Sequence, residues 1–212
     1  MGVGSITAAL LLGVAGVASG WMSGSSFGTH GTMMGSVFGG GGHDIGMDRA
    51  VTIAQNVGTS SSSGGLAADE VIEFSNNYYA SIREKSTQIG AFEILIDRTT
   101  GGVVREPGPD MMWNTKYSVM RGGMMGGFGF RNSGPMTVTA QQAQDIAQRW
   151  IDANQSGTTA KSADPFYGYY TVDFEKAGTL VGMLSVNGYT GQVWYHSWHG
   201  GFIQLRDLGA AA

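Results

Sequence analysis

The chain has no cysteine among its 212 residues. This absence excludes disulfide bonds, thiolate zinc sites, iron–sulfur clusters and the covalent attachment of a c-type haem. It does not identify the cellular compartment, because an exported protein can also lack disulfides.

Charged residues are scarce, with 12 Lys and Arg, 16 Asp and Glu, and a net charge of −4. A chain without a basic surface is a poor partner for nucleic acid. The sequence also lacks an HExxH zinc motif, a GxSxG nucleophile elbow and a phosphate-binding P-loop. We therefore expect a protein that is not an enzyme and that binds no cofactor apart from the copper discussed below.

Charge is missing altogether from the N-terminal segment, since no Asp, Glu, Lys or Arg precedes Asp44. The apolar run over residues 3–22 has about the 20 residues that a membrane helix needs. A cleaved signal peptide with its cut before Gly20 is an alternative, although it would lack the usual basic start. A buried helix would have to be apolar on every face. Residues 1–22 are predicted to be a membrane helix or signal segment, with the bulk of the chain on the extracytoplasmic side.

Glycine is abundant, at 36 residues, and is concentrated in two linkers that are also rich in methionine. These linkers cover residues 23–46 and 108–134, and a short tail covers residues 206–212. Such a composition cannot bury a core, so we expect irregular structure there.

Three sequence blocks occur twice in the same order. AVTIAQNV at position 50 matches AQDIAQRW 93 positions later, and YYASIREK at position 78 matches YYTVDFEK 91 positions later. IDRTTGGVV at position 96 matches VNGYTGQVW 90 positions later. The repeats predict a duplicated unit over residues 47–107 and 135–205, each a helix followed by an antiparallel sheet. Units of this size have marginal cores, so we expect them to pack together.

Local signals place the elements of each unit. The first copy has a helical stripe over residues 47–57 and strand patterns at 70–75, 78–85, 91–97 and 103–104. In the second copy, Thr139 and Gln142 fit a capping box ahead of the helix. A loop at 154–161 is followed by a three-stranded meander over 169–175, 180–186 and 192–198. Asn187-Gly188 and Thr190-Gly191 supply the tight turn of its second hairpin.

An A-x-x-I-A helix core followed by a D/N-x-x-T-G-x-V hairpin resembles the PepSY domain family. The matching residues are Ala50, Ile53, Ala54, Asp97, Thr100, Gly101 and Val103 in the first copy, and Ala143, Ile146, Ala147, Asn187, Thr190, Gly191 and Val193 in the second. The resemblance implies extracytoplasmic, often membrane-tethered domains that inhibit or bind rather than catalyse. It brings no catalytic residues to this chain, which also has no attached peptidase.

Methionine and histidine come close together in the first linker. His30, Met33, Met34, His43 and Met47 combine thioether and imidazole groups three or four residues apart. Such ligands suit Cu(I) when no cysteine is present. The alternative is that methionine acts as adaptable apolar filler against a partner or membrane. Met-Met pairs also occur at 111–112 and 124–125.

A second candidate site lies near the C-terminus, where Trp194, Tyr195, His196, Trp198 and His199 follow one another closely. On a strand, His196 and His199 would point to opposite faces, so joint chelation requires the strand to end at His196. That position is equivalent to Glu106 in the first copy. We interpret the group as an aromatic binding cluster that closes the sheet, with each histidine held by hydrogen bonds.

The sequence therefore predicts an α+β fold in which an N-terminal apolar membrane helix precedes two tandem helix-plus-antiparallel-sheet units that resemble PepSY domains. The predicted function is that of a non-catalytic, membrane-anchored accessory subunit that binds protein partners in a larger assembly. The alternative is a copper-binding accessory protein that uses the methionine and histidine ligands.

Overall fold

The computed structural model describes residues 43–61, 65–119 and 134–209. Within these residues the same order of one helix and four strands occurs twice. The N-terminal half contains α2 (Met47–Ser60), β1 (Leu66–Phe74), β2 (Tyr78–Glu84), β3 (Gly90–Ile96) and β4 (Val103–Arg105). The C-terminal half contains α4 (Ala140–Asn154), β5 (Thr159–Phe166), β6 (Tyr169–Lys176), β7 (Thr179–Asn187) and β8 (Val193–Tyr195). A short helix, α3 (Pro109–Met112), lies between the halves, and a ninth strand, β9 (Phe202–Asp207), ends the described chain.

The helix of the C-terminal half begins as its sequence predicts. The Thr139 hydroxyl accepts from the Gln142 backbone N–H, and the Gln142 side chain accepts from the Thr139 backbone N–H, so the capping box is confirmed. Ala143, Ala147 and Ile151 then form the buried stripe of α4. Their spacing places them on one face, which packs against the strands of the same half.

The two D/N-x-x-T-G-x-V hairpins have the same turn. Asp97 Oδ1 accepts from the backbone N–H groups of Thr99 and Thr100 at 3.0 and 2.7 Å. Asn187 Oδ1 accepts from the two equivalent groups, each at 3.0 Å. The following glycines, Gly101 and Gly191, have φ values of 71° and 70°, which a side chain disfavours. The motif therefore specifies a turn rather than a reactive site.

The helix motif and the hairpin motif meet in space, which explains why they occur together. A Cβ on Gly101 would lie 3.0 Å from Cδ1 of Ile53, and one on Gly191 would lie 3.1 Å from Cδ1 of Ile146. The glycines thus let each hairpin approach the isoleucine of its own helix. The two motifs form one packing unit that is present in both halves.

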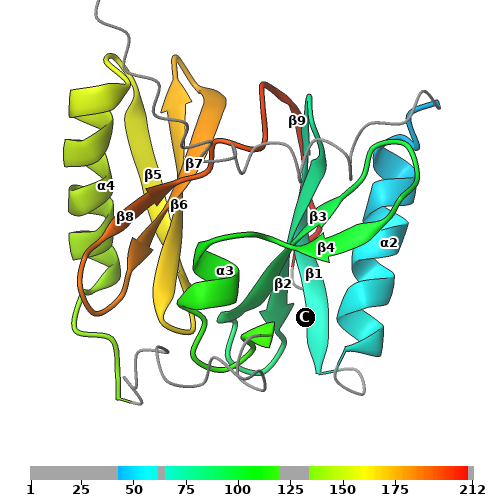
Figure 1. The fold of residues 1–212 in the computed structure, drawn as a ribbon, viewed down its shortest axis with the longest axis horizontal. Coiled ribbons are helices and arrows are strands. Elements are labelled where there is room, and N and C mark those ends of the chain that lie inside the picture. The colour runs from blue at the N-terminus through cyan, green and yellow to red at the C-terminus, as the bar shows by residue number, and fades with distance from the viewer. Residues whose placement is uncertain (1–42, 62–64, 120–133, 210–212) are drawn as a thin grey trace, which may run out of the picture.

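All nine strands belong to one mixed sheet, so the predicted fold class with two separate antiparallel sheets is wrong. The strand order is β8-β7-β6-β5-β3-β2-β1-β9, with β4 paired to β3 outside this path. The halves join where β3 and β5 pair in parallel at Gly90 and Phe166. Figure 1 shows the result, with α4 and α2 on opposite flanks and the strands between them.

The predicted apolar membrane helix has no counterpart among the residues that the structure describes. No helix in the described ranges is long and apolar enough to cross a membrane. Residues 3–22, for which that helix was predicted, lie outside the described residues, as do most of the first linker and the end of the predicted tail.

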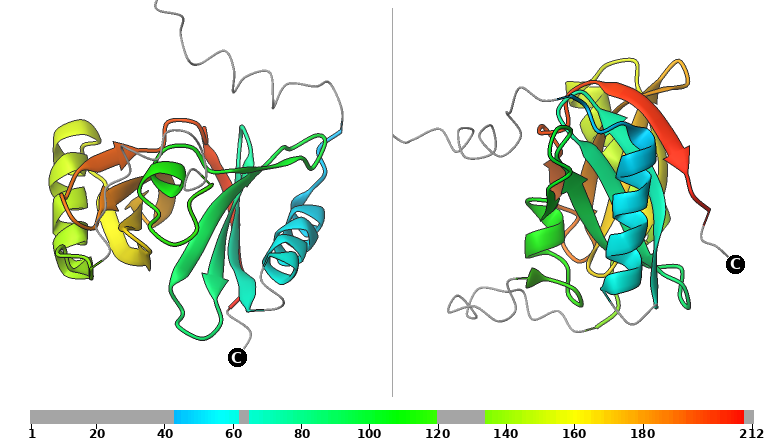
Figure 2. Two further views of the ribbon diagram at one scale, coloured as in Figure 1. Left: turned by 60° about the horizontal axis from the view of Figure 1, so that its bottom comes forward. Right: turned by 90° about the vertical axis from the view of Figure 1, so that its right-hand side faces the viewer.

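Two strands were not predicted from the sequence. β5 includes part of the segment expected to be a loop, and its Pro165 and polar residues hide the strand pattern. β9 covers the start of the predicted tail and leaves the C-terminal half to pair antiparallel with β1 of the N-terminal half. Figure 2 shows this strand running along the half that carries α2. The halves are therefore interlocked and are not two units in simple succession.

The second predicted linker is structured where it begins. Residues 108–119 contain α3 and the buried side chains of Trp113 and Asn114, whereas residues 120–133 lie outside the described part. Lys116 and Tyr117 donate hydrogen bonds to Glu84 at the end of β2. Burial alone would raise the pKa of Glu84, but these bonds and one from Tyr167 lower it to about 2.

Strand pairing fixes the correspondence between the halves and corrects one sequence match. Ile94 pairs with Arg105, and Leu184, 90 positions later, pairs with Tyr195. Ala80 faces Ile94, whereas Val172 faces Leu184, so β2 and β6 correspond at 92 positions rather than at the 91 of the matched letters. A one-residue shift moves every side chain to the other face of a strand. Tyr79 is thus the equivalent of Thr171, and both point away from the helices.

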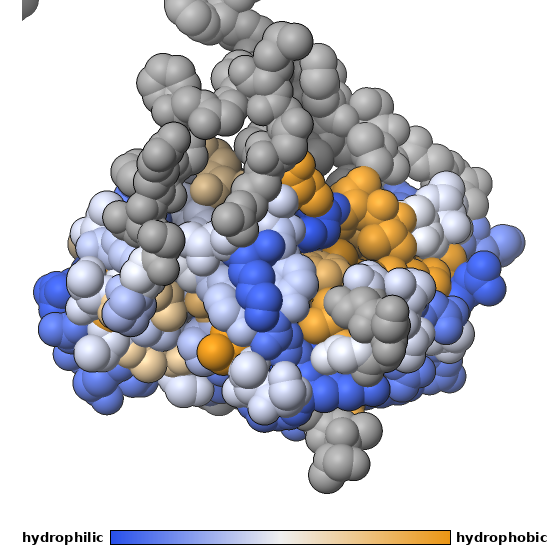
Figure 3. Space-filling view, turned by 90° about the horizontal axis from the view of Figure 1, so that it is seen from below, coloured by the Kyte–Doolittle hydropathy of each residue, from blue (hydrophilic) through white to orange (hydrophobic). Residues whose placement is uncertain are grey.

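Each half has its own apolar core beneath its helix, and a further cluster joins the two. The shared cluster contains Ile72, Phe74, Tyr79 and Leu95 from the N-terminal half and Leu180 and Met183 from the C-terminal half. The faces that carry no helix therefore turn toward each other. Seen from below in Figure 3, the surface mixes hydrophilic areas with an apolar area toward one side. Buried polar groups gather between the two faces and form the candidate site.

Candidate functional site

The candidate site is built from Glu106, His196 and His199, which come from the ends of two equivalent strands. Glu106 follows β4 and His196 follows β8. The Glu106 backbone N–H donates to Glu93 O at 3.0 Å, and that of His196 donates to Met183 O at 3.1 Å. These paired bonds end each short strand in the same way, and they hold the two side chains between the halves.

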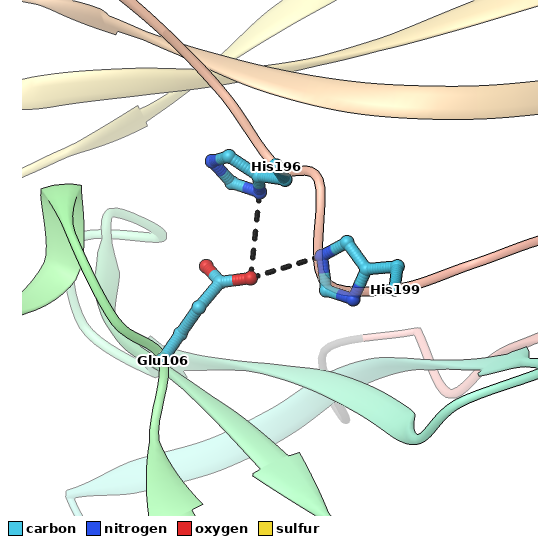
Figure 4. Close-up of side chains that lie close together, drawn as sticks. All are labelled: Glu106, His196 and His199. Atoms are coloured by element: carbon cyan, nitrogen blue, oxygen red, sulfur yellow. Dashed lines mark ion pairs between the residues drawn. The ribbon is translucent and has the colours of Figure 1, made fainter. Parts of the chain in front are cut away.

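The three side chains meet at one carboxylate oxygen (Figure 4). Glu106 Oε1 lies 3.4 Å from His196 Nδ1 and 3.0 Å from His199 Nε2. The exposed fractions of the three side chains are 0%, 0% and 3%. One ligand atom from each residue lies within 4.8 Å of the other two, and in the part of the chain that the structure describes no other group of three such residues is this compact.

The far nitrogen of each histidine is held by a polar neighbour. His199 Nδ1 lies 3.0 Å from Asn77 Oδ1, and His196 Nε2 lies 3.0 Å from the Ser185 hydroxyl. The Asn77 amide is oriented by its Nδ2, which donates to Trp198 O at 3.2 Å. Because Asn77 presents its oxygen to His199, Nδ1 of His199 must carry the proton of that hydrogen bond. This arrangement fixes which nitrogen faces Glu106, as outer partners do for metal-binding histidines.

Three buried atoms of the cluster have no hydrogen-bond partners of good geometry. They are His196 Nδ1, His199 Nε2 and Glu106 Oε2. Glu106 Oε1 accepts from Trp198 Nε1 at 3.1 Å. With the proton of His199 on Nδ1, its Nε2 turns a lone pair toward a carboxylate, which is repulsive unless a cation lies between them. The cation can be a proton or a metal ion.

Aromatic rings enclose the cluster. Phe74 stacks on His199 with ring centroids 4.4 Å apart, and Trp198 stacks on His196 at 4.8 Å. Tyr79 meets His199 edge-on at 5.6 Å. Rings on these sides exclude water, so electrostatic interactions inside the cluster are stronger than at a surface.

The protonation of the cluster follows from burial and charge. Burial lowers the pKa of His199, although the Glu106 carboxylate acts in the opposite direction. Burial alone would raise the pKa of Glu106, but His196 and His199 more than reverse this and hold it well below its usual range. Glu106 is therefore an anion at neutral pH, and His199 resists taking up the proton that would balance it.

A second buried carboxylate, Glu93, lies next to this site on β3. It accepts hydrogen bonds from Tyr79 and Tyr169, both at 2.7 Å, and from Thr171 at 2.7 Å. Burial, together with the nearby Glu106 and Asp110, raises the pKa of Glu93 well above its usual value. Because Tyr169 and Thr171 belong to the C-terminal half, Glu93 links the halves.

The structure separates the predicted aromatic binding cluster into three groups. His196, Trp198 and His199 come together, and the condition for their convergence is met because β8 ends at Tyr195. Trp194 instead contacts Trp113, with ring centroids 5.8 Å apart. Tyr195 stacks on Trp150 at 5.4 Å, beside the core of the C-terminal half.

The predicted copper ligands belong mostly to the undescribed part of the chain. His30, Met33 and Met34 lie outside the described residues. His43 is exposed at the start of the described chain, and Met47 is buried in the core of the N-terminal half at 6% exposure.

Sequence reasoning did not assign Glu106 to the site, although it identified the residue as the repeat equivalent of His196. That equivalence was a usable signal, because equivalent positions in a duplicated unit can lie across its symmetry axis. Asn77 and Ser185 had no comparable signal, since Asn77 belongs to a polar turn after Ser75 and Asn76, and Ser185 is a single polar residue in an apolar strand.

No family model and no curated protein matches the chain. Among solved structures, it is similar to the Bacillus megaterium YpeB C-terminal domain, with a TM-score of 0.26 and 11% sequence identity. The match covers 72% of this chain and 62% of the other, so this chain spans less than two thirds of that structure. At this TM-score, the likeness indicates nothing about function.

Proposed function

We propose that the protein is a non-catalytic metal-binding protein that holds a borderline divalent transition-metal ion, such as Zn²⁺, at Glu106, His196 and His199. The bound ion links the N-terminal half, through Glu106, to the segment that leads from β8 into β9. Its role is to fix how the two halves pack.

The observation that carries the proposal is the set of unpartnered buried atoms in the cluster. Three buried groups that can coordinate a metal lie within 4.8 Å of one another, and both histidines present nitrogens without hydrogen bonds of good geometry. Unpaired buried polar atoms are costly. A cation bound among them removes that cost and balances the Glu106 charge.

The ligand types favour a particular class of metal. Two imidazoles and a carboxylate suit Zn²⁺ and its neighbours, whereas Cu(I) prefers thioether and thiolate sulfur. The histidines keep their outer hydrogen bonds to Asn77 and Ser185, as ligands of a stable site do. Three protein ligands leave one position of a tetrahedral ion for water. Burial of all three ligands favours a structural role for the ion, because a catalytic metal needs that position open to substrate.

The proposal also includes a relation to the PepSY family. The shared contact between the A-x-x-I-A helix and the T-G hairpin favours reading each half as a PepSY-like unit. Binding to a partner protein and an extracytoplasmic location remain predictions from the sequence. Cu(I) binding by His30, Met33, Met34, His43 and Met47 also remains a prediction.

Metal titration tests the proposal. The chelator-treated full chain is titrated with Co²⁺, whose visible absorption reports the coordination of the ion, and then with Zn²⁺ to displace it. We expect one equivalent to bind, with Trp198 fluorescence changing because its ring lies on His196. The variants Glu106→Gln and His199→Ala should each lose binding by about 10–100-fold or more.

The His43→Ala variant is the matched control, because it removes an exposed histidine outside the cluster. It should bind metal as the parent does. Binding that disappears in His43→Ala but persists in Glu106→Gln would assign the metal to the first linker and reject the proposed site. A folded parent chain that takes up neither ion would reject metal binding at this cluster altogether.

A further inference from the structure

A small acidic cavity lies at the seam of the two halves, apart from the histidine cluster. Its volume is about 40 Å³, and it is lined by residues of β1 and β2 on one side and of β5 and β6 on the other. Gly90 and Phe166, the one pair that joins β3 to β5, form part of its wall. The cavity therefore opens where the two parallel strands diverge and carries groups from both halves.

Carboxylates dominate the lining. Asp69 and Glu70 come from β1, Asp164 from β5 and Asp173 from β6. Two cations lie nearby, and each forms one ion pair, although Lys161 also opposes the rise in the pKa of Glu70 and Asp173. Arg83 forms an ion pair with Asp69, and Lys161 forms one with Glu175 at 3.3 Å. Glu70 and Asp173 thus face each other across the seam with more negative than positive charge around them.

An independent feature points into the same cavity. Ser81 lines it and is only 6% exposed, yet its hydroxyl oxygen has no hydrogen-bond partner. Ser81 is the register partner of Glu70, so the hydroxyl and the carboxylate belong to adjacent positions on β2 and β1. A buried hydroxyl with no partner is unfavourable unless a ligand or water satisfies it.

We propose that this cavity binds a hydrated hard divalent cation, Ca²⁺ or Mg²⁺, between Glu70 and Asp173, with the Ser81 hydroxyl as an additional oxygen ligand. All the donors are oxygens, which hard cations prefer. A cavity of about 40 Å³ also has room for water beside the ion. Water must complete the coordination, because in the described chain only the Glu106 cluster brings three ligand groups within 4.8 Å.

The two carboxylates of the cavity have raised pKa values, as like charges held close together do. Burial, reinforced by Asp173, Asp164 and Asp69, raises the pKa of Glu70 to about 8. Burial raises the pKa of Asp173 to about 7, with Asp164 and Glu175 adding to the rise and Lys161 and His196 opposing it. Protons therefore occupy these carboxylates near neutral pH. A divalent cation that replaces them must bind more tightly as the pH rises.

This site differs from the proposed transition-metal site in ligands, in metal class and in position. A cation at the seam neutralises like charges on β1 and β6, so it adds cohesion between the halves. The proposal therefore holds or fails independently of metal binding at Glu106.

The test is a titration of the chelator-treated full chain with CaCl₂ and with MgCl₂, followed by thermal unfolding. At about pH 8.5, where both carboxylates are mainly ionised, we expect millimolar cation to raise the melting temperature. At about pH 6, roughly tenfold more cation should be needed, because protons compete for the same oxygens. Calorimetry in two buffers of different ionisation enthalpy should detect the protons released on binding.

The variants Glu70→Gln and Asp173→Asn should abolish the response, and Ser81→Ala should weaken it. The first two remove repulsion within the cavity, so they should remain folded in the absence of cation, as circular dichroism can show. Asp152→Asn on the exposed face of α4 is the control and should respond as the parent does. Glu106→Gln should also keep the response, which separates this site from the histidine cluster.

Two results would overturn the proposal. One is a folded parent chain whose melting temperature does not change with Ca²⁺ or Mg²⁺ at about pH 8.5. The other is an undiminished response in the Glu70→Gln, Asp173→Asn double variant. In either case the raised pKa values would reflect only protons shared across the seam.

Discussion

Glu106 and His196 occupy the same position in two copies of one structural unit, and their side chains face each other with Oε1 and Nδ1 3.4 Å apart. Both backbone N–H groups make equivalent hydrogen bonds, to Glu93 and Met183. A duplicated position near the axis between the copies meets its own counterpart. Two equivalent positions thus carry different groups, an acidic carboxylate in one half and a basic imidazole in the other.

In the metal-free protein, His199 should contribute less to stability in acid than at neutral pH. Burial lowers the pKa of this residue below its ordinary 6.5, so the unfolded chain takes up a proton that the folded chain refuses. The contribution of His199 to stability should fall as the pH drops below about 6.5, and that of Glu106 should fall below its ordinary value of about 4.5. Urea unfolding from about pH 8 to pH 4 measures the slope.

The His199→Gln variant isolates this contribution. Glu70 and Asp173, whose pKa values are raised, favour the folded state as the pH falls, and they do so equally in parent and variant. The difference between the two profiles should therefore shrink from neutral pH toward pH 5. A difference that stays constant with pH would show that His199 does not titrate as proposed.

Gly200 should resist substitution at the crossing from β8 to β9. Its φ is 80°, and a Cβ there would lie 2.2 Å from Ser75 Oγ and 2.9 Å from Cγ of Asn76. We expect Gly200→Ala to lower the free energy of unfolding by about 1–3 kcal/mol. Chemical denaturation measures the loss. Gly201→Ala is the matched control, because no atom lies within 4 Å of a Cβ at that position. Equal effects at the two positions would contradict this explanation.

The geometry of the hairpin turns predicts how substitutions of Asp97 affect stability. Its Oδ1 accepts two backbone N–H groups and the Thr100 hydroxyl. Asp97→Ala leaves these donors without their acceptor and should cost about 1–2 kcal/mol of stability. Asp97→Asn should cost much less, because Asn187 makes the same turn in the other half. A loss in Asp97→Asn as large as in Asp97→Ala would show that the charge matters rather than the acceptor.

Removal of β9 should loosen β1 selectively. A chain that ends at Gly201 keeps both helices and the buried residues of their cores. It loses the pairing of Glu70–Phe74 with the last strand, and also Leu208, which packs against the N-terminal core. In hydrogen exchange, the β1 amides that bonded to β9 should lose protection by about tenfold or more. Amides of β7 in the other half serve as the internal reference. Equal loss in β7 would mean that β9 supports the whole molecule instead.

Short-range signals in the sequence predicted the elements that local contacts specify. The Thr139 capping box and the Asn187 hairpin each depend on residues only a few positions apart. The same is true of the helical stripes. These signals can be recognised in the sequence because the groups that form each hydrogen bond are close together in the chain.

Pairing between strands far apart in the chain was harder to predict from the sequence. β9 pairs with a strand more than 100 residues earlier, and its Ile203 and Leu205 are 49% and 41% exposed. A strand that is open to solvent shows no alternation of buried and exposed residues. The tyrosine pairs that begin YYASIREK and YYTVDFEK also gave the wrong correspondence between β2 and β6. Their identical letters align one position away from the true strand register.

Only part of the candidate site could be predicted from the sequence, because the site also depends on long-range packing. His196 and His199 were recognised, and their convergence was tied to where the strand ends. Glu106 lies 90 positions earlier in the chain, and Asn77 lies in a turn between β1 and β2. Only the packing of one half against the other brings them to the histidines, and no periodicity in the sequence encodes that packing.

Because β9 crosses to the other half, an exchange of this strand between two molecules would also move the residues next to it. The segment that leads into β9 contains both histidines, whereas Glu106 stays with the half that β9 joins. If β9 left its own β1 and docked on that of a second copy, the histidines of one molecule would meet the glutamate of the other. Dimers formed in this way would share two composite ion sites, and their lifetime would depend on the ion that occupies them.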